Sequence, residues 1–502
     1  MNRFKKWLCL ALAALMLTSS LASCATAGTP TDTSVNLGTD TVETQDPDED
    51  PRFKDVNYDG REFRIYTSAL DGGNSLSSNN LIEGSGKTGG GLVSDAVFER
   101  NVTVEEKLGI SLVFYPCKLS WGSIAPDIRK YTQAGDDEFD LVINDIYDYA
   151  ELVVEGHFRN TLDDECVFDF DRNYWYKDYM EDLRLINGYQ YILAGDFFID
   201  VLRSAQLLLV NKDLYREYYR TSADELYDVV SDYKWTYEKL TAIVTDIYID
   251  RNQDGTKNAG DQFGFASHGY WGAALPMVCS GTNNAITRDE SGIPTITIHE
   301  GDRANQLAAA MTKLLNNENS SLDHGGGPLE VFVRGDAMVA GGVSLGSLEN
   351  TSLRAMESDA AVLPYPMLFE TDKKYITSTN DITEMGAILT TSTDLAFIST
   401  VIEVLNRETA EILIPKYYRE SLQIQCVDDE KAAAMIDIIH DNFGNAFLLA
   451  YNHALGSQII QAFSTAAEKK REYSAVFAGG AKSVNKTLSK LINSYLDKAN
   501  VD

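Results

Sequence analysis

Residues 95–115 read DAVFERNVTVEEKLGISLVFY, and this stretch decides the fold class. Val97, Val104 and Leu108 recur at the spacing of one helix face, and Gly109 stops the helical pattern. Apolar and polar residues then alternate over Ile110–Tyr115, as is typical of a strand. We therefore expect a helix followed directly by a strand, which is the unit from which α/β sheets are built.

The same alternation of strands and helices continues along the chain, and it predicts an α/β layered domain with a largely parallel sheet. The last hundred residues read as mostly helical. The predicted strands are 62–66, 110–115, 139–143, 189–193 and 204–211, and the predicted helices are 95–108, 127–134, 147–155, 235–249, 304–315, 395–405, 432–441, 457–468 and 482–496, with a further helix opened by Lys212.

The N-terminus has the layout of a secretion signal. A basic segment, Met1–Lys6, precedes the apolar run Trp7–Leu17, which is too short to cross a bilayer as a permanent helix. Leu21-Ala22-Ser23-Cys24 resembles the lipobox of bacterial lipoproteins, in which the cysteine becomes the lipidated first residue. This implies a signal peptide over residues 1–23 and a lipid anchor on Cys24, with the chain on the extracellular face of the membrane, at the cell surface or in the periplasm. The alternative is an ordinary signal peptide with an incidental cysteine.

The charge of the chain is strongly acidic. Its 502 residues carry 75 Asp and Glu against 43 Lys and Arg, a formal charge of −32, and loss of residues 1–23 would make it −35. Such a charge repels nucleic acid, anionic lipid and carboxylate-rich partners, and it favours a neutral or cationic ligand. A chain of this length should form two or more domains.

Four cysteines remain after Cys9 and Cys24 are set aside: Cys117, Cys166, Cys279 and Cys426. They lie far apart without a CxxC spacing, so we do not expect zinc. Four cysteines allow three pairings, and the sequence does not choose between disulfides and free thiols. We expect buried packing residues.

An Asx-rich segment, Asp250–Asp261, reads DRNQDGTKNAGD and predicts a structural Ca²⁺ site. Oxygen-bearing side chains stand at loop positions 1, 3, 5, 9 and 12, and glycine stands at position 6 for the sharp turn. Asp rather than Glu at position 12 should weaken the site. An Asx-rich turn without metal is the alternative. The candidate ligands are Asp250, Asn252, Asp254 and Asp261 through their side chains and Thr256 through its carbonyl.

A short pattern raises an enzymatic alternative. Gly342–Gly346 matches the G-x-S-x-G nucleophile elbow, with Ser344 as the nucleophile. Asp394 and either His440 or His453 follow in the order of an α/β-hydrolase triad. A secreted serine hydrolase is thus an alternative to a binding protein, and a Gly-rich turn explains the pattern as well.

Several aromatic residues stand among Gly, Asp, Asn and Ser rather than inside apolar runs. Flat rings with neighbouring hydrogen-bonding groups suit a neutral polyhydroxy ligand or a peptide, although each ring alone is also compatible with packing. The aromatic residues are Trp121, Tyr147, Trp175, Tyr270, Trp271, Tyr365 and Tyr375, and the polar neighbours are Asn144, Asp145 and Asp196.

Five further segments appear in a recognisable order: DAVFERN at 95–101, FDLV at 139–142, VNKDL at 210–214, KWT at 234–236 leading to FGF at 263–265, and VLPYP at 362–366. Together with the lipobox, they resemble the extracellular solute-binding lipoproteins of bacterial ABC importers, the group that includes maltose-binding protein. The resemblance spans residue 55 to the C-terminus.

This resemblance implies a two-lobed, periplasmic-binding-protein-like α/β fold of type II, with a helical C-terminal region and a ligand cleft between the lobes. The expected division is a signal peptide over 1–23, an acidic Thr-rich tether over 24–54, lobe 1 over 55–197 and 358–412, and lobe 2 over 198–357 and 413–502. The first crossing between lobes would lie near 195–203.

The resemblance also implies a function. A solute, expected to be a carbohydrate or oligosaccharide, would be captured by hinge closure and delivered to a membrane permease, without covalent chemistry and by a monomer. Gly341–Ser344 stands where sugar-binding relatives often have a tryptophan, which leaves a peptide or another solute possible. A non-transport adhesion or sensing protein is a further alternative. The expected ligand-binding residues are Asn144, Asp145, Tyr147, Asp196, Tyr270, Trp271 and Tyr375.

Overall fold

The computed structural model describes residues 50–68, 79–117, 119, 122–283, 285–324, 326–422 and 430–499. Arg52–Asp502 forms one unit, which is described here by itself. The predicted signal peptide, Cys24, most of the tether, Trp121 and Cys426 lie outside the described residues.

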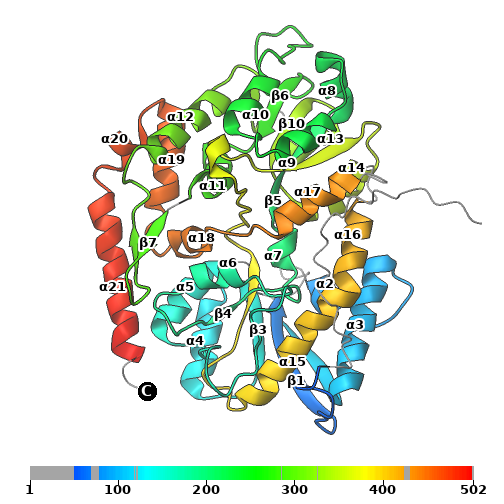
Figure 1. Cartoon of the computed structure of the whole chain (residues 1–502), viewed down its shortest axis with the longest axis vertical. Coiled ribbons are helices and arrows are strands. Elements are labelled where there is room, and N and C mark those ends of the chain that lie inside the picture. The colour runs from blue at the N-terminus through cyan, green and yellow to red at the C-terminus, as the bar shows by residue number, and fades with distance from the viewer. Residues whose placement is uncertain are drawn as a thin grey trace, which may run out of the picture. The chain divides into compact units, whose positions relative to one another are not determined.

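The first sheet has five strands in the order β2-β1-β3-β12-β4 and occupies the lower half of Figure 1. β1 pairs in parallel with both β2 and β3, whereas β12 pairs antiparallel with β3 and β4. The strands are β1 (Arg61–Ser68), β2 (Ile110–Cys117), β3 (Leu141–Asp145), β4 (Ile192–Leu193) and β12 (Glu384–Ala387).

The second sheet, in the upper half of Figure 1, has the order β11-β5-β10-β6-β9. β6 is parallel to β9 and β10, and β5 is antiparallel to β10 and β11. The expectation of a largely parallel sheet is therefore wrong, because both sheets are mixed. β5 and β12 each reach their sheet from the other sheet instead of through a returning helix, so no βαβ unit forces them parallel. The strands are β5 (Gln206–Asn211), β6 (Phe263–Ser267), β9 (Ser320–Leu322), β10 (Ala337–Ser344) and β11 (Ala360–Pro364).

Helices cover both sheets, and the helix predicted over 95–108 is present. α3 buries Val97, Val104 and Leu108 and ends at Gly109, whose left-handed backbone (φ 60°) suits glycine. The principal helices are α2 (Asn79–Ile82), α3 (Leu92–Leu108), α4 (Ala125–Ala134), α5 (Ile146–Glu155), α6 (Lys177–Asp182), α7 (Asp200–Arg203), α8 (Lys212–Tyr219), α9 (Glu225–Ser231), α10 (Tyr237–Val244), α11 (Tyr270–Gly281), α12 (Arg303–Leu315), α13 (Pro328–Val333), α14 (Thr351–Arg354), α15 (Leu395–Glu408), α16 (Ile414–Leu422), α17 (Glu430–His440), α18 (Ala446–Asn452), α19 (Gln458–Lys469), α20 (Tyr473–Phe477) and α21 (Ala481–Ala499). Short helical turns η2 (Leu345–Glu349), η3 (Glu370–Asp372) and η4 (Thr409–Leu413) and a hairpin of β7 (Ile286–Arg288) and β8 (Pro294–Ile296) complete the fold.

Two segments carry the chain from one sheet to the other. The first crossing, 194–205, joins β4 to β5, and the second crossing, 365–383, joins β11 to β12. They lie side by side where Gln206 N donates to the Ser378 carbonyl at 2.8 Å and the hydroxyls of Ser204 and Thr383 meet at 2.7 Å. The predicted lobe boundaries stay a prediction, although β11 belongs to the second sheet and favours a boundary after Pro364 rather than at 358.

The described cysteines are all free: Cys117 and Cys279 are buried, and Cys166 is partly exposed. Within the described part of the chain, no helix combines the length and the apolar character needed to span a membrane.

Candidate functional site

The carboxyl end of β3 places Asn144 and Asp145 at the centre of the first sheet, and both side chains are buried. One carboxylate oxygen of Asp145 accepts the N–H of Gly122 at 3.2 Å, and the other has no hydrogen-bond partner among the described residues. Burial is the main cause that raises the pKa of Asp145 to about 7; the N–H of Gly122 opposes the rise, and the nearby carboxylates of Asp148 and Glu384 add to it. Asp145 is therefore poised between its acid and its carboxylate form near neutral pH.

Tyr147, in the first turn of α5, lies against a residue from the far end of the chain. Its hydroxyl is 2.8 Å from Nδ1 of His453, and the two rings stack with their centroids 4.3 Å apart. Gly122 lies beneath the Tyr147 ring, where a Cβ would approach to 3.2 Å. The predicted binding residue Tyr147 is thus half-buried in an aromatic pair that joins α5 to the end of α18.

The predicted residues of the second sheet, Tyr270 and Trp271, open α11 directly after β6. The Trp271 side chain is 38% exposed, whereas the Tyr270 hydroxyl donates to the Asn316 side chain at 2.9 Å. Trp271 is therefore free to offer a flat apolar face to a ligand.

Two neighbours of Trp271 were not predicted. His268 follows β6, Asp323 follows β9, and the His268 ring lies 3.2 Å from the Asp323 carboxylate. A Cβ on Gly342 would approach that ring to 3.0 Å. Since β6 and β9 are parallel neighbours, their carboxyl ends meet at one edge of the sheet, which is the usual place for ligands in α/β sheets. The sequence alone does not show that β6 and β9 are neighbours, so it could not bring His268 and Asp323 together.

The other two predicted binding residues, Asp196 and Tyr375, are buried and already have protein partners. Asp196 accepts the Tyr176 hydroxyl at 2.8 Å and lies 3.6 Å from Nε2 of His440. Burial opposes the charge on His440, but the nearby carboxylates of Asp196 and Asp441 outweigh burial and raise its pKa to about 10. The Tyr375 hydroxyl donates to the Val230 carbonyl at 2.8 Å. A ligand-binding role for Asp196 and Tyr375 stays a prediction.

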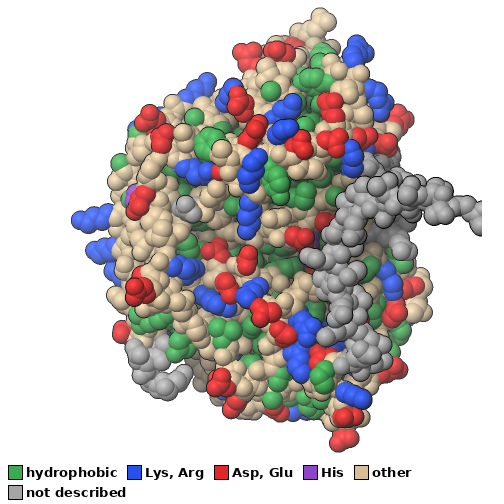
Figure 2. Space-filling model, viewed as in Figure 1, with side chains coloured by type: hydrophobic (Ala, Val, Ile, Leu, Met, Phe, Trp, Pro, Cys, Tyr) green, Lys and Arg blue, Asp and Glu red, His purple; other side chains and the backbone are tan. Residues whose placement is uncertain are grey.

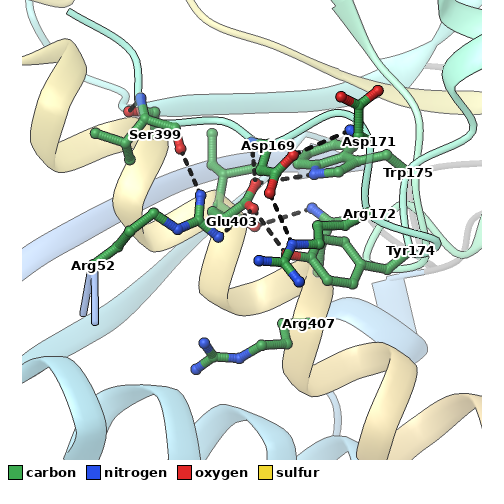
Figure 3. Close-up of polar contacts among 12 residues, drawn as sticks. Arg52, Asp169, Asp171, Arg172, Tyr174, Trp175, Ser399, Glu403 and Arg407 are labelled. Atoms are coloured by element: carbon green, nitrogen blue, oxygen red, sulfur yellow. Dashed lines mark hydrogen bonds and ion pairs between the residues drawn. The ribbon is translucent and has the colours of Figure 1, made fainter. Parts of the chain in front are cut away.

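Trp175, which the sequence groups with the aromatic residues of polar loops, is buried beside α15 (Figure 3). Its indole N–H donates to the Glu403 carboxylate at 2.9 Å. The same carboxylate accepts the Tyr174 hydroxyl at 2.8 Å and Arg52 at 3.2 Å. Trp175 therefore stabilises the part of the fold around the first sheet.

The residues of the hydrolase alternative have separate partners. The Ser344 hydroxyl is 3.5 Å from that of Ser347, Asp394 caps α15 through the N–H of Phe397, and His453 bonds Tyr147. The structure does not bring a Ser–His–Asp arrangement together from these residues.

The Asx-rich segment forms a turn closed by its own side chains. Asp250 accepts two backbone N–H groups of the turn, and Asp254 accepts both the N–H and the hydroxyl of Thr256. Asp261 is buried and accepts the N–H groups of Arg251 and Asn258. No group of three or more Asp, Glu, His or Cys side chains within the described residues is arranged to hold a metal. The same oxygens would have to exchange these bonds for Ca²⁺, so the ligand set of Asp250, Asn252, Asp254, Thr256 and Asp261 stays a prediction.

A cavity of about 480 Å³ lies among segments that follow β1 and segments that follow β10. Glu349 on its wall pairs with Arg203 at 2.9 Å and accepts the Tyr417 hydroxyl at 2.7 Å. Apart from the Gly- and Ser-rich composition of residues 84–91, the sequence gives no signal of this cavity. It is lined by Asn79, Asn80, Leu81, Gly84, Ser85, Gly90, Gly91, Val93, Ser94, Glu349, Arg354 and Tyr417.

Comparison with known proteins settles the fold. The sequence matches no protein family and no curated protein. Among solved structures, the chain is similar to the ABC substrate-binding protein Lmo0181 from Listeria monocytogenes, solved in complex with cycloalternan, with 12% identity, a TM-score of 0.53 and coverage of 86% of this chain and 100% of that one. The chain has the fold of an ABC substrate-binding protein. The expected two-lobed, type II α/β fold is thereby confirmed. The maltose- and maltodextrin-binding domain MalE from Bdellovibrio bacteriovorus, bound to maltotriose, is also similar at 11% identity and a TM-score of 0.49, with the same coverage.

Proposed function

We propose that this chain is an extracellular solute-binding protein that captures a carbohydrate or oligosaccharide for an ABC permease. The observation that carries the proposal is the pair of mixed sheets joined by adjacent crossing segments, in the fold of a protein solved with cycloalternan. Such a fold lets two bodies close on a ligand between them.

The polar and aromatic groups at the strand ends support a carbohydrate. The first sheet presents Asp145 and Tyr147, and the second presents Trp271 with the His268–Asp323 pair. Aromatic faces stack on the apolar faces of sugar rings, and carboxylate and imidazole groups bond hydroxyls. A solute that contacts both sets favours the closed conformation by its differential affinity.

The membrane location of this function follows from the N-terminal sequence. We propose that Cys24 carries the lipid anchor, that residues 24–54 act as the tether, and that the Asp250–Asp261 turn binds a structural Ca²⁺. The folded part would then act as a monomer on the outer face of the membrane and exchange solute with the permease.

The experiment is thermal unfolding of a soluble chain that begins at Ala25, with sugars, oligosaccharides and short peptides at fixed calcium. A ligand that binds only the folded state raises the midpoint in a concentration-dependent way. A rise with one class of sugar would support the proposal and name the solute. A rise with peptides alone would contradict the carbohydrate assignment.

Two variants locate the site once a sugar is found. Tyr147→Ala and Trp271→Ala should each weaken binding roughly two- to twelvefold, as expected for loss of about 0.5–1.5 kcal/mol of ring contact. Tyr115→Ala removes an exposed ring from the edge strand β2 and should leave the affinity unchanged. Equal effects of all three variants would argue against a site between these strand ends.

A further inference from the structure

The last helix of the chain, α21, is attached to the fold along one face. Its buried side chains are Val484, Leu488, Ile492 and Tyr495. They recur every three or four residues and so form one stripe, which packs against α5 and the hairpin strand β8. Asn485 fixes this contact through two hydrogen bonds with the backbone of Ile296. The opposite face of α21 is left to the solvent.

Three lysines occupy this opposite face, and we call them the lysine stripe. Lys482, Lys486 and Lys490 follow one another at intervals of four residues, and all three are exposed. At a rise of about 1.5 Å per residue, they extend over about 12 Å of the helix. Within the described part of the chain, none of their side chains pairs with a carboxylate. Figure 2 shows Lys and Arg side chains projecting from the left edge of the molecule, where Figure 1 draws α21.

The stability of the helix does not account for the lysine stripe. Lys482 lies in the first turn of α21, where the positive end of the helix dipole disfavours a cation. No Asp or Glu stands three or four residues from any lysine of the stripe, and like charges four residues apart repel each other. The first acidic residue of α21 is Asp497, about two turns beyond Lys490. A positive surface that the helix itself does not favour points to a partner outside the helix.

The segment that leads into α21 adds to this positive charge. Residues 469–490 contain six Lys or Arg and one Glu, in a chain whose formal charge is −32. Lys469, Lys470 and Arg471, at the end of α19, are exposed like the lysine stripe. By contrast, Arg64 and Arg129 each pair with two carboxylates. The positive charge near α21 is therefore local, and its sign is opposite to that of the whole molecule.

We propose that the lysine stripe binds the anionic headgroups of a phospholipid membrane and so orients the protein on its surface. Ammonium groups are compact charges that suit a fluid anionic surface, and clusters of about four to eight Lys and Arg are attracted to such surfaces. Among the described residues of α21, no large apolar side chain is exposed. Protein interfaces are built around buried aromatic and apolar anchors, so this face fits a membrane better than an acidic protein.

The net charge of the chain does not prevent this contact. At physiological ionic strength the screening length is about 8 Å, so only the charges nearest to the membrane act on it. The acidic remainder of the surface is repelled, and the molecule approaches the membrane with α21 first. The inference goes beyond solute capture and rests on the proposed function only in placing the chain beside a membrane.

Cosedimentation with lipid vesicles tests the contact without the lipid anchor, in the soluble chain that begins at Ala25. Vesicles of phosphatidylglycerol and phosphatidylcholine should bind the chain, whereas vesicles of phosphatidylcholine alone should not. The triple variant Lys482→Gln, Lys486→Gln and Lys490→Gln should weaken binding on the order of a hundredfold, since each cation near an anionic surface contributes roughly fivefold. Binding should also fall steeply as salt rises from about 0.1 M to about 1 M.

A matched control removes the same charge from lysines elsewhere on the surface. The triple variant Lys54→Gln, Lys87→Gln and Lys239→Gln changes three exposed lysines outside α21 and should bind nearly as well as the unaltered chain. Replacement of the three lysines of the stripe by arginine keeps the charge and should keep the binding. Equal losses in the two glutamine variants would overturn the proposal, because net charge and not the stripe would then govern binding. Failure of the unaltered chain to bind anionic vesicles would also overturn it.

Poly-L-glutamate in the same assay separates a membrane from an acidic protein. Binding of the chain to poly-L-glutamate but not to anionic vesicles would overturn the proposal and assign the lysine stripe to an acidic protein partner. Sugar binding is measured separately, by thermal unfolding. Failure to bind vesicles would therefore leave solute capture standing, and failure to bind any sugar would contradict the proposed function while the vesicle assay still decides on the lysine stripe.

Discussion

Glu403 shows how much of the fold can depend on one buried side chain. It lies on α15 and accepts hydrogen bonds from Arg52, Tyr174 and Trp175, which come from the start of the described unit and from the segment before α6 (Figure 3). A carboxylate suits this position because it accepts several donors at once.

Glu403→Gln should therefore lower the free energy of unfolding by about 1–3 kcal/mol, since the amide N–H₂ would face donors that it cannot bond. Urea unfolding followed by tryptophan fluorescence measures the change. Glu106→Gln makes the same substitution at an exposed position of α3 and should change stability by less than about 0.5 kcal/mol. Equal effects at the two positions would show that the bonds to Glu403 contribute nothing.

Asp145 makes stability depend on pH in the opposite sense to a paired carboxylate. Its pKa rises from an ordinary value of 3.8 to about 7 in the folded state. The folded state thus binds a proton at Asp145 more tightly than the unfolded chain does. The contribution of Asp145 to the free energy of unfolding is therefore largest at low pH and falls as pH rises from about 4 to about 7. Asp145→Asn should raise the unfolding midpoint at pH 8 and change it little at pH 4, measured by differential scanning calorimetry. An Asn variant less stable than the unaltered protein at pH 8 would contradict this.

At the scale of single residues, the sequence shows which candidate side chains follow a strand, because a polar residue after an apolar run is readable from sequence. Asp145 ends β3, Tyr147 lies in the first turn of α5 and Trp271 in the first turn of α11, and their ligand-binding role stays a prediction. His453 and His268 were not found as partners, since their contacts depend on packing between segments far apart in the chain.

At the scale of elements, periodicity located most helices and strands to within a few residues. The predicted helix 95–108 is found as α3 and the predicted helix 395–405 as α15. The predicted helix 235–249 ends at Val244, where Thr245 adopts an extended backbone. Strand direction could not be predicted, because an apolar run reads the same whichever way it enters a sheet.

The start of α15 offers a test of element stability. The Asp394 side chain accepts the N–H of Phe397 at 3.1 Å, which caps the helix, and it pairs with Arg61 at 2.6 Å. Asp394→Ala should lower stability by about 1 kcal/mol. Asp394→Asn keeps the capping oxygen and should cost less, so chemical unfolding of the two variants separates the cap from the ion pair. Identical losses would show that the cap is not the source of the effect.

At the scale of the whole molecule, charge outside the lysine stripe is spread rather than gathered. On the face shown in Figure 2, acidic and basic side chains are interspersed, although the chain as a whole carries a formal charge of −32. A long-range negative potential of this kind acts on any solute before it reaches the strand ends.

This potential predicts discrimination against anionic sugars that depends on salt. A neutral trisaccharide of galactose should bind more tightly than the matching trisaccharide of galacturonic acid, because each carboxylate of the latter is repelled by the acidic chain. The ratio of the two dissociation constants should shrink as ionic strength rises from about 0.01 M to about 1 M, since the screening length falls from about 30 Å to about 3 Å. Binding of the neutral sugar, measured by calorimetry over the same range, serves as the control and should stay nearly constant. A ratio that does not change with salt would place the discrimination in short-range contacts at Asp145 and Asp323 rather than in the net charge of the molecule.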